Sequence, residues 1–195
     1  MIDEFTGAEV VRTLRSADPG GARLFATATA EVLVAWFPPE VPLEPLLAAG
    51  QDLTRRSLRY LWDSVESGGA PGEGQDLQTE IEGLLEEYAD EIGLFEDALA
   101  GLHYAVQNAS RSDLGQVGLV AEKLYEATEE RAIERSVRGS RDFREPAAIR
   151  SLPEIQRVLR FLGRALDLAV ELTPGTDVGD SVRSARELVR EAGVL

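Results

Sequence analysis

Residues 77–91 read LQTEIEGLLEEYADE, and the spacing of their apolar side chains decides the fold class. Leu77, Ile81, Leu84, Leu85 and Tyr88 stand at i, i+4, i+7, i+8 and i+11, which places them on one face of an α-helix. The rest of the circumference is acidic and carries Glu80, Glu82, Glu86, Glu87, Asp90 and Glu91. The segment therefore predicts an amphipathic helix that buries one stripe and exposes carboxylates.

Helical patterns continue on both sides of this segment. Residues 6–9 and 151–154 each have the Ser/Thr-x-x-Glu form of a capping box, and Asp18 before Pro19 is a typical helix start. We expect a rigid connector over 38–45, a short helical turn at 46–47 and a flexible Gly-rich loop over 67–75. The expected helices cover residues 6–16, 19–37, 51–66, 77–91, 94–108, 113–136, 151–173 and 178–192, the last stopped by Gly193.

These elements predict an all-α fold, in which residues 1–195 form a single-domain bundle of about eight helices. Within it, helix 19–37 is expected to turn Leu24, Ala28, Val32 and Ala35 towards the core, because they recur at helical spacing.

Composition excludes several classes of protein. A chain of 195 residues can bury a core without disulfides or metals. With no cysteine and one histidine, it has no thiolate metal site, no cysteine nucleophile and no site that needs two imidazoles. A net charge of −15 argues against nucleic acid as a partner, because phosphate neutralisation needs clustered Lys and Arg. Without a signal peptide or a long apolar run, we expect a cytoplasmic protein that does not enter a membrane.

The negative charge is concentrated in one part of the chain. Residues 60–110 hold 12 Asp and Glu side chains and no Lys or Arg, whereas the segments before and after them are nearly neutral. The candidate partner-binding residues are therefore Glu82, Glu86, Glu87 and Asp90, and they would attract a basic protein partner or support self-association. The alternative is a solvated face that maintains solubility. Arg55, Arg56 and Arg59 of the preceding helix are expected to offset part of the repulsion between these carboxylates.

Two further features allow more than one interpretation. His103 lies on the flank of the apolar stripe of helix 94–108 and could be a general base or a boundary residue with one satisfied nitrogen. A series of arginines at intervals of three or four residues, which we call the basic ridge, could bind an anion or another subunit, or could pair within its own chain. The basic ridge consists of Arg131, Arg135, Arg138, Arg141 and Arg144.

Three stretches carry a resemblance to a known family. They are Gln51 with Arg55-Arg56 leading into Leu61-Trp62, the Leu-rich helix 94–108, and residues 188–193, which read LVREAG. From about Leu24 to the end, the chain resembles the bacterial YjaG-like family, a domain of unknown function. The resemblance implies an all-α, cytoplasmic bacterial protein with no established activity. The chain has Leu99 where members tend to carry Asp, so no family site residue is transferred.

Two functional hypotheses follow. The favoured one is a non-enzymatic protein-binding module that uses the acidic helical face, for example an inhibitor of the immunity or antitoxin type. The alternative is a carboxylate-based divalent-metal-binding protein or enzyme with a cleft between helices, since pairs such as Glu82 and Glu86 place two carboxylates on one side of a helix. The sequence assigns no catalytic residue, no metal ligand and no cofactor.

Overall fold

Helices account for most of the chain. The computed structural model describes residues 6–38, 44–69, 72–88, 93, 95–138, 146–173 and 176–193. Of these residues 87% are helical and none lies in a strand, which confirms the predicted all-α fold. The helices of this part of the chain are α1 (Gly7–Leu14), α2 (Pro19–Trp36), α3 (Glu44–Ser67), α4 (Gly74–Tyr88), α5 (Phe95–Arg111), α6 (Leu114–Arg138), α7 (Pro146–Arg150), α8 (Pro153–Glu171) and α9 (Val178–Ala192).

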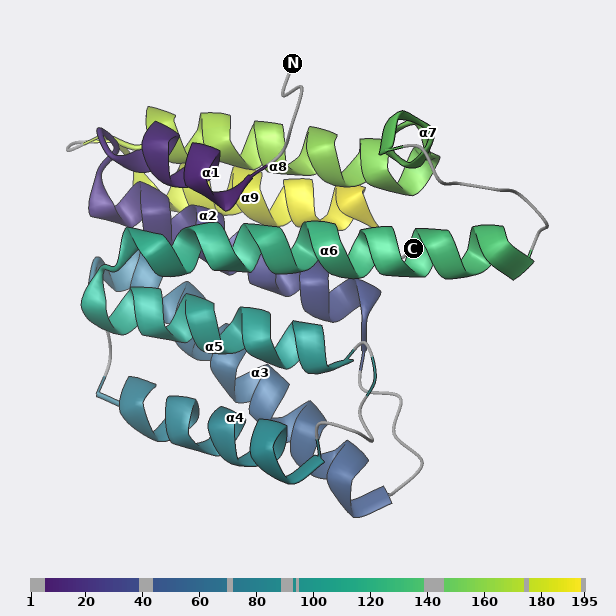
Figure 1. Cartoon of the computed structure of the whole chain (residues 1–195). Coiled ribbons are helices and arrows are strands. Elements are labelled where there is room, and N and C mark those ends of the chain that lie inside the picture. Colours follow the sequence, from purple (N-terminus) through teal and green to yellow (C-terminus); the bar gives the residue numbers. More distant parts are fainter. Residues whose placement is uncertain are drawn as a thin grey trace.

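The second helix, α2, lies at the centre of the bundle. It packs against α3, α5, α6, α8 and α9, and Figure 1 shows it crossing the molecule behind α6. Leu24, Ala28 and Val32 are buried as predicted, whereas Ala35 is exposed. Burial extends around almost the whole helix and not along one stripe, because half of its residues are Gly, Ala or Thr and allow neighbouring helices to approach from every side.

Capping residues fix several helix starts. The Thr6 hydroxyl accepts a hydrogen bond from the Glu9 amide at 3.3 Å, and the Asp18 carboxylate accepts one from the Gly20 amide at 2.7 Å, so both predicted caps are confirmed. The capping box predicted at 151–154 is wrong. Because Pro153 is the first helical residue, Leu152 is the N-cap, and Ser151 donates instead to the Ala148 carbonyl at 2.7 Å.

Other boundaries differ from the prediction. Helix α3 begins at Glu44 and absorbs the turn expected at 46–47, since Pro45 is tolerated in a first helical turn. Helix α4 begins three residues early, at Gly74, and the short α7 was not predicted. Helix α9 and its stop at Gly193, which has φ +67°, are as predicted. Residues 39–43 of the predicted connector, 70–71 of the loop and 89–91 of the predicted acidic helix lie outside the described residues.

The acidic helix lies at one edge of the bundle. Helix α4 packs on α3 and α5 and is at the bottom of the molecule in Figure 1. Leu77 and Ile81 are buried and Leu84 and Leu85 are half-buried, so the predicted apolar stripe faces inward. The carboxylates on the other side of α4 consequently face solvent.

One close contact holds α2 against α8. A Cβ atom built on Gly21 would overlap with the carbonyl oxygen of Ala169, so only glycine fits at this point without a backbone shift. Because the obstacle is backbone and not a flexible side chain, a rotamer change cannot make room.

Gly21→Ala is expected to lower the free energy of unfolding by about 1–3 kcal/mol, because the added methyl group forces one backbone to move. Urea unfolding followed by circular dichroism measures the change. Gly163→Ala in α8 is the control: a Cβ there meets nothing within 4 Å. It should raise stability by about 0.5–1 kcal/mol through better helix propensity. Equal stability of Gly21→Ala and wild type would contradict this account of the contact.

Candidate functional site

The predicted partner-binding residues gather on one exposed surface. We call the exposed carboxylates of α4 the acidic face. It comprises Asp76, Glu80, Glu82, Glu86 and Glu87, all of which are exposed. Asp90, the fourth predicted partner-binding residue, lies outside the described residues.

Glu80 is neutralised by an arginine of the neighbouring helix, as expected. The Arg56 guanidinium donates to both carboxylate oxygens of Glu80 and also to Asp52 of its own helix, at 2.9 Å. These hydrogen bonds lower the pKa of the Glu80 carboxyl. The expectation is less well met for the other two arginines, because Arg55 pairs with Asp52 at 3.2 Å and Arg59 makes no ion pair within the described chain.

Glu82 is held by the single histidine. Its carboxylate lies 2.9 Å from Nε2 of His103, which projects from α5 and has a side chain 16% exposed. This geometry agrees with the interpretation of His103 as a boundary residue with one satisfied nitrogen. It also means that α5 fixes the position of one predicted partner-binding carboxylate.

Glu86 and Glu87 differ from Glu80 and Glu82, which each contact a side chain of a neighbouring helix. Both are exposed, and neither forms an ion pair with any residue that the structure describes. They are adjacent on the outer side of an edge helix, so a partner could reach both carboxylates together. Together with Asp76 in the first turn of α4, which also forms no ion pair with a described residue, they form the available part of the acidic face.

The basic ridge is used within its own chain where its side chains are described. Arg131 donates to the Trp36 carbonyl at 2.7 Å and lies 5.4 Å above the centre of the Phe37 ring, so it caps the C-terminal end of α2. Arg135 forms an ion pair with Glu154 at 3.7 Å. The intramolecular alternative therefore holds for these two, although Arg131 contacts a carbonyl and not an acid. The side chains of Arg138, Arg141 and Arg144 lie outside the described residues.

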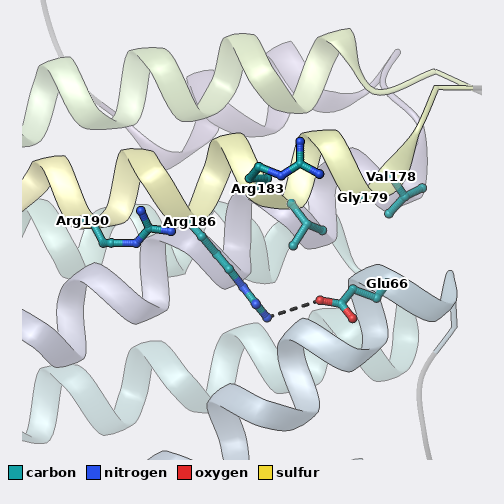
Figure 2. Close-up of a pocket in the computed structure, with 7 residues that line it drawn as sticks. Glu66, Val178, Gly179, Arg183, Arg186 and Arg190 are labelled. Carbon is teal, nitrogen blue, oxygen red and sulfur yellow. Dashed lines mark hydrogen bonds and ion pairs between the residues drawn. The ribbon is translucent and has the colours of Figure 1, made fainter.

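A basic groove that the sequence analysis missed lies between α9 and the C-terminal end of α3. It has a volume of about 500 Å³ and is lined by three arginines of α9, by Glu66 of α3 and by an apolar wall. Figure 2 shows the three arginines projecting from α9, with Arg186 extending across to Glu66. Their spacing of i, i+3 and i+7 was visible in the sequence. The sequence did not show that the C-terminal end of α3 lies opposite them. The groove arginines are Arg183, Arg186 and Arg190.

The described helices offer neither a metal-binding cluster nor a membrane-spanning segment. Within the described ranges, no group of three or more His, Asp or Glu side chains is arranged to hold a metal ion. No described helix is both long enough and apolar enough to cross a membrane.

The fold and these surfaces define an all-α helical bundle whose candidate functional groups are charged side chains on its exterior. A DUF416 family protein from Shewanella baltica OS155 has a similar structure, with a TM-score of 0.70, 14% sequence identity and 94% of each chain covered. At this identity the likeness shows a shared fold, which is that of an uncharacterised family, and it does not identify the chain as YjaG-like. No family model and no curated protein matches the sequence.

Arg56→Gln is expected to raise the pKa of the Glu80 carboxyl towards its ordinary value, because the lost hydrogen bonds favour the charged form. In wild type, the stability contributed by this pair is present above the unfolded-state pKa and is lost as pH falls through the lowered folded-state pKa. A carbon-detected NMR titration of Glu80 checks the shift. Arg55→Gln, which removes a charge at the adjacent position, should leave Glu80 unchanged; a shift of equal size there would contradict the assignment to Arg56.

Proposed function

We propose that the protein is a non-enzymatic binding module that docks a basic protein surface on the acidic face of α4. The observation that supports this most directly is the pair Glu86 and Glu87, exposed and adjacent on an edge helix with no cation beside them in the described part of the chain. Complementary charge on a partner would speed association and fix its orientation.

The charge pattern within α4 supports the same proposal. Like charges at i, i+4, such as Glu82 and Glu86, destabilise a helix by about 0.2–0.5 kcal/mol per pair. Arg56 relieves the repulsion at Glu80, and Glu82 lies within hydrogen-bond distance of His103, but the described residues supply neither contact at Glu86. A basic partner would provide the missing cation.

A glycine in the middle of the acidic face is compatible with the proposal, and Gly163 of α8, with equally open surroundings, supplies its control. Gly83 is exposed, and a Cβ built on it would meet nothing within 4 Å. Glycine in a helix interior costs about 0.5–1 kcal/mol relative to alanine, and no packing against the described residues requires it here. A partner that approaches the backbone of α4 closely would account for it.

For the domain organisation, the location and the family, we propose what the sequence predicts. The proposal treats residues 1–195 as one domain that acts in the cytoplasm, and it keeps the resemblance to the YjaG-like family, which assigns no activity.

The double variant Glu86→Gln/Glu87→Gln is expected to lose basic partners that wild type retains from a lysate of the native host, because it removes two adjacent carboxylates that form no ion pair in the described part of the chain. Quantitative mass spectrometry of the bound proteins, at low and at near-physiological salt, measures the loss. Sedimentation velocity of the purified protein identifies self-association. Binding should weaken steeply with salt, since exposed charges are screened over about 8–10 Å.

The matched control is Asp167→Asn/Glu171→Gln, which removes two exposed carboxylates from α8. It should retain the same partners as wild type. If both double variants lose them equally, net charge and not the acidic face is responsible, and the proposal fails.

The variant Gly83→Gln tests whether a partner lies close to the backbone of α4, because it adds a side chain there without changing the charge. The variant should be at least as stable as wild type, because glutamine is the better helix former and its side chain has free space. Its partner binding should nevertheless fall, since the new side chain would occupy the approach to the backbone. Gly163→Gln is the control in α8. Partner binding by Gly83→Gln equal to that of wild type would rule out close approach at this position.

A further inference from the structure

The basic groove has a sign of charge opposite to that of the whole protein. Three arginines and one glutamate line it, in a chain whose net charge is −15. Because charges beyond about 8 Å are largely screened at physiological salt, the local arginines and not the net charge determine what this groove attracts.

The central arginine is held in place from two sides. The Arg186 guanidinium lies 4.8 Å from the centre of the Trp62 ring and 3.3 Å from the Glu66 carboxylate. Trp62 is itself fixed, because its indole N–H donates to Glu31 of α2 at 2.7 Å. A guanidinium that lies over an aromatic face keeps its N–H donors in its own plane, available at the edges. The Arg186 guanidinium is therefore pre-oriented, and only part of its set of N–H donors is bonded to Glu66.

The two flanking arginines have further unused donors. Arg183 bonds to Asp180 of its own helix at 2.8 Å through one nitrogen, and Arg190 forms no ion pair with any described residue. Each guanidinium has five N–H donors. At i, i+3 and i+7 the three arginines span about 10 Å of helix. Arg183 and Arg190 therefore flank the ordered guanidinium of Arg186 along one side of the helix.

The remaining lining and the size of the groove restrict the kind of ligand. Val178 and Val182 form an apolar wall beside the arginines. A volume of about 500 Å³ falls within the range of about 300–1,000 Å³ that is usual for small-molecule sites. Arginine matches planar or tetrahedral oxyanions through paired N–H donors, and a phosphate ester supplies up to two negative charges and three acceptor oxygens.

We propose that the groove between α9 and the C-terminal end of α3 binds a small organic phosphate, with Arg183, Arg186 and Arg190 contacting its phosphoryl oxygens. The inference is independent of the acidic face of α4. Arg186 also links α9 to Trp62 and Glu66 of α3, so the test relies on the two flanking arginines, whose replacement leaves that link intact.

Isothermal titration calorimetry with glycerol 3-phosphate, inorganic phosphate and acetate tests the proposal on the full chain. We expect saturable binding in which both phosphates bind more tightly than acetate. Arg183→Gln/Arg190→Gln should weaken phosphate binding by about tenfold or more, since each exposed charge pair contributes up to about fivefold. The control Arg157→Gln/Arg160→Gln removes two exposed arginines from α8 and should bind like wild type.

Three results would overturn the proposal: no saturable binding at millimolar phosphate, equal affinity for acetate, or equal losses in the two double variants. A sedimentation assay with phosphatidic acid vesicles distinguishes a soluble ligand from a lipid headgroup. Binding to vesicles without binding to glycerol 3-phosphate would contradict the soluble form proposed here. Amide chemical shifts of α9 in the presence of phosphate locate the site, and shifts confined to other helices would also contradict it.

Discussion

At Gly21 the backbone of α2 lies against the Ala169 carbonyl of α8, in a contact that leaves no room for a side chain. This approach is possible because α2 is built largely from small residues, and it lets five helices surround a sixth. A helix buried on every side cannot carry charge without a large desolvation cost. Within α2 only Arg23 and Glu31 are charged, and both are half-buried. Most charged groups of this protein consequently lie on the outer helices, and a function that uses them takes place on the surface.

The charged side chains of the outer helices are of two kinds. Some bond to a neighbouring helix, as Arg56 does to the Glu80 carboxylate and Arg131 to the Trp36 carbonyl at the end of α2. Others, such as Glu86 and Arg190, form no ion pair in the described part of the chain. The first kind ties helices together, although exposed pairs contribute at most about 1 kcal/mol each. The second kind does not tie helices together, so it is free to meet a ligand where the fold gathers it, as in the proposals for Glu86 and Arg190.

Much of the fold follows from local rules that the sequence shows directly. Helix α9 was predicted at its observed bounds, with Gly193 as its stop, because a C-terminal glycine acts within one turn of the helix end. Asp177, which the prediction did not use, caps the other end. The errors arose where two local signals compete. Ser151 resembles a cap, but Pro153 prefers the first helical position and shifts the cap to Leu152. Burial around all of α2 could not be predicted from periodicity, because a stripe of Leu24, Ala28 and Val32 says nothing about what covers the opposite side.

The candidate sites also show that helical spacing does not reveal what a helix face contacts. Arg157, Arg160 and Arg164 of α8 repeat the i, i+3, i+7 spacing of the groove arginines, so spacing alone cannot distinguish the two sets. The difference lies in what each set meets. Arg186 lies over Trp62, a residue 124 positions earlier in the chain and on another helix, whereas Arg164 pairs with Glu191 at the surface. Helical periodicity defines which residues share a face, but only tertiary packing decides whether that face meets an aromatic ring, an acid or water. A functional assignment on a helical bundle of this kind therefore depends on the neighbouring helix as much as on the helix that carries the residues.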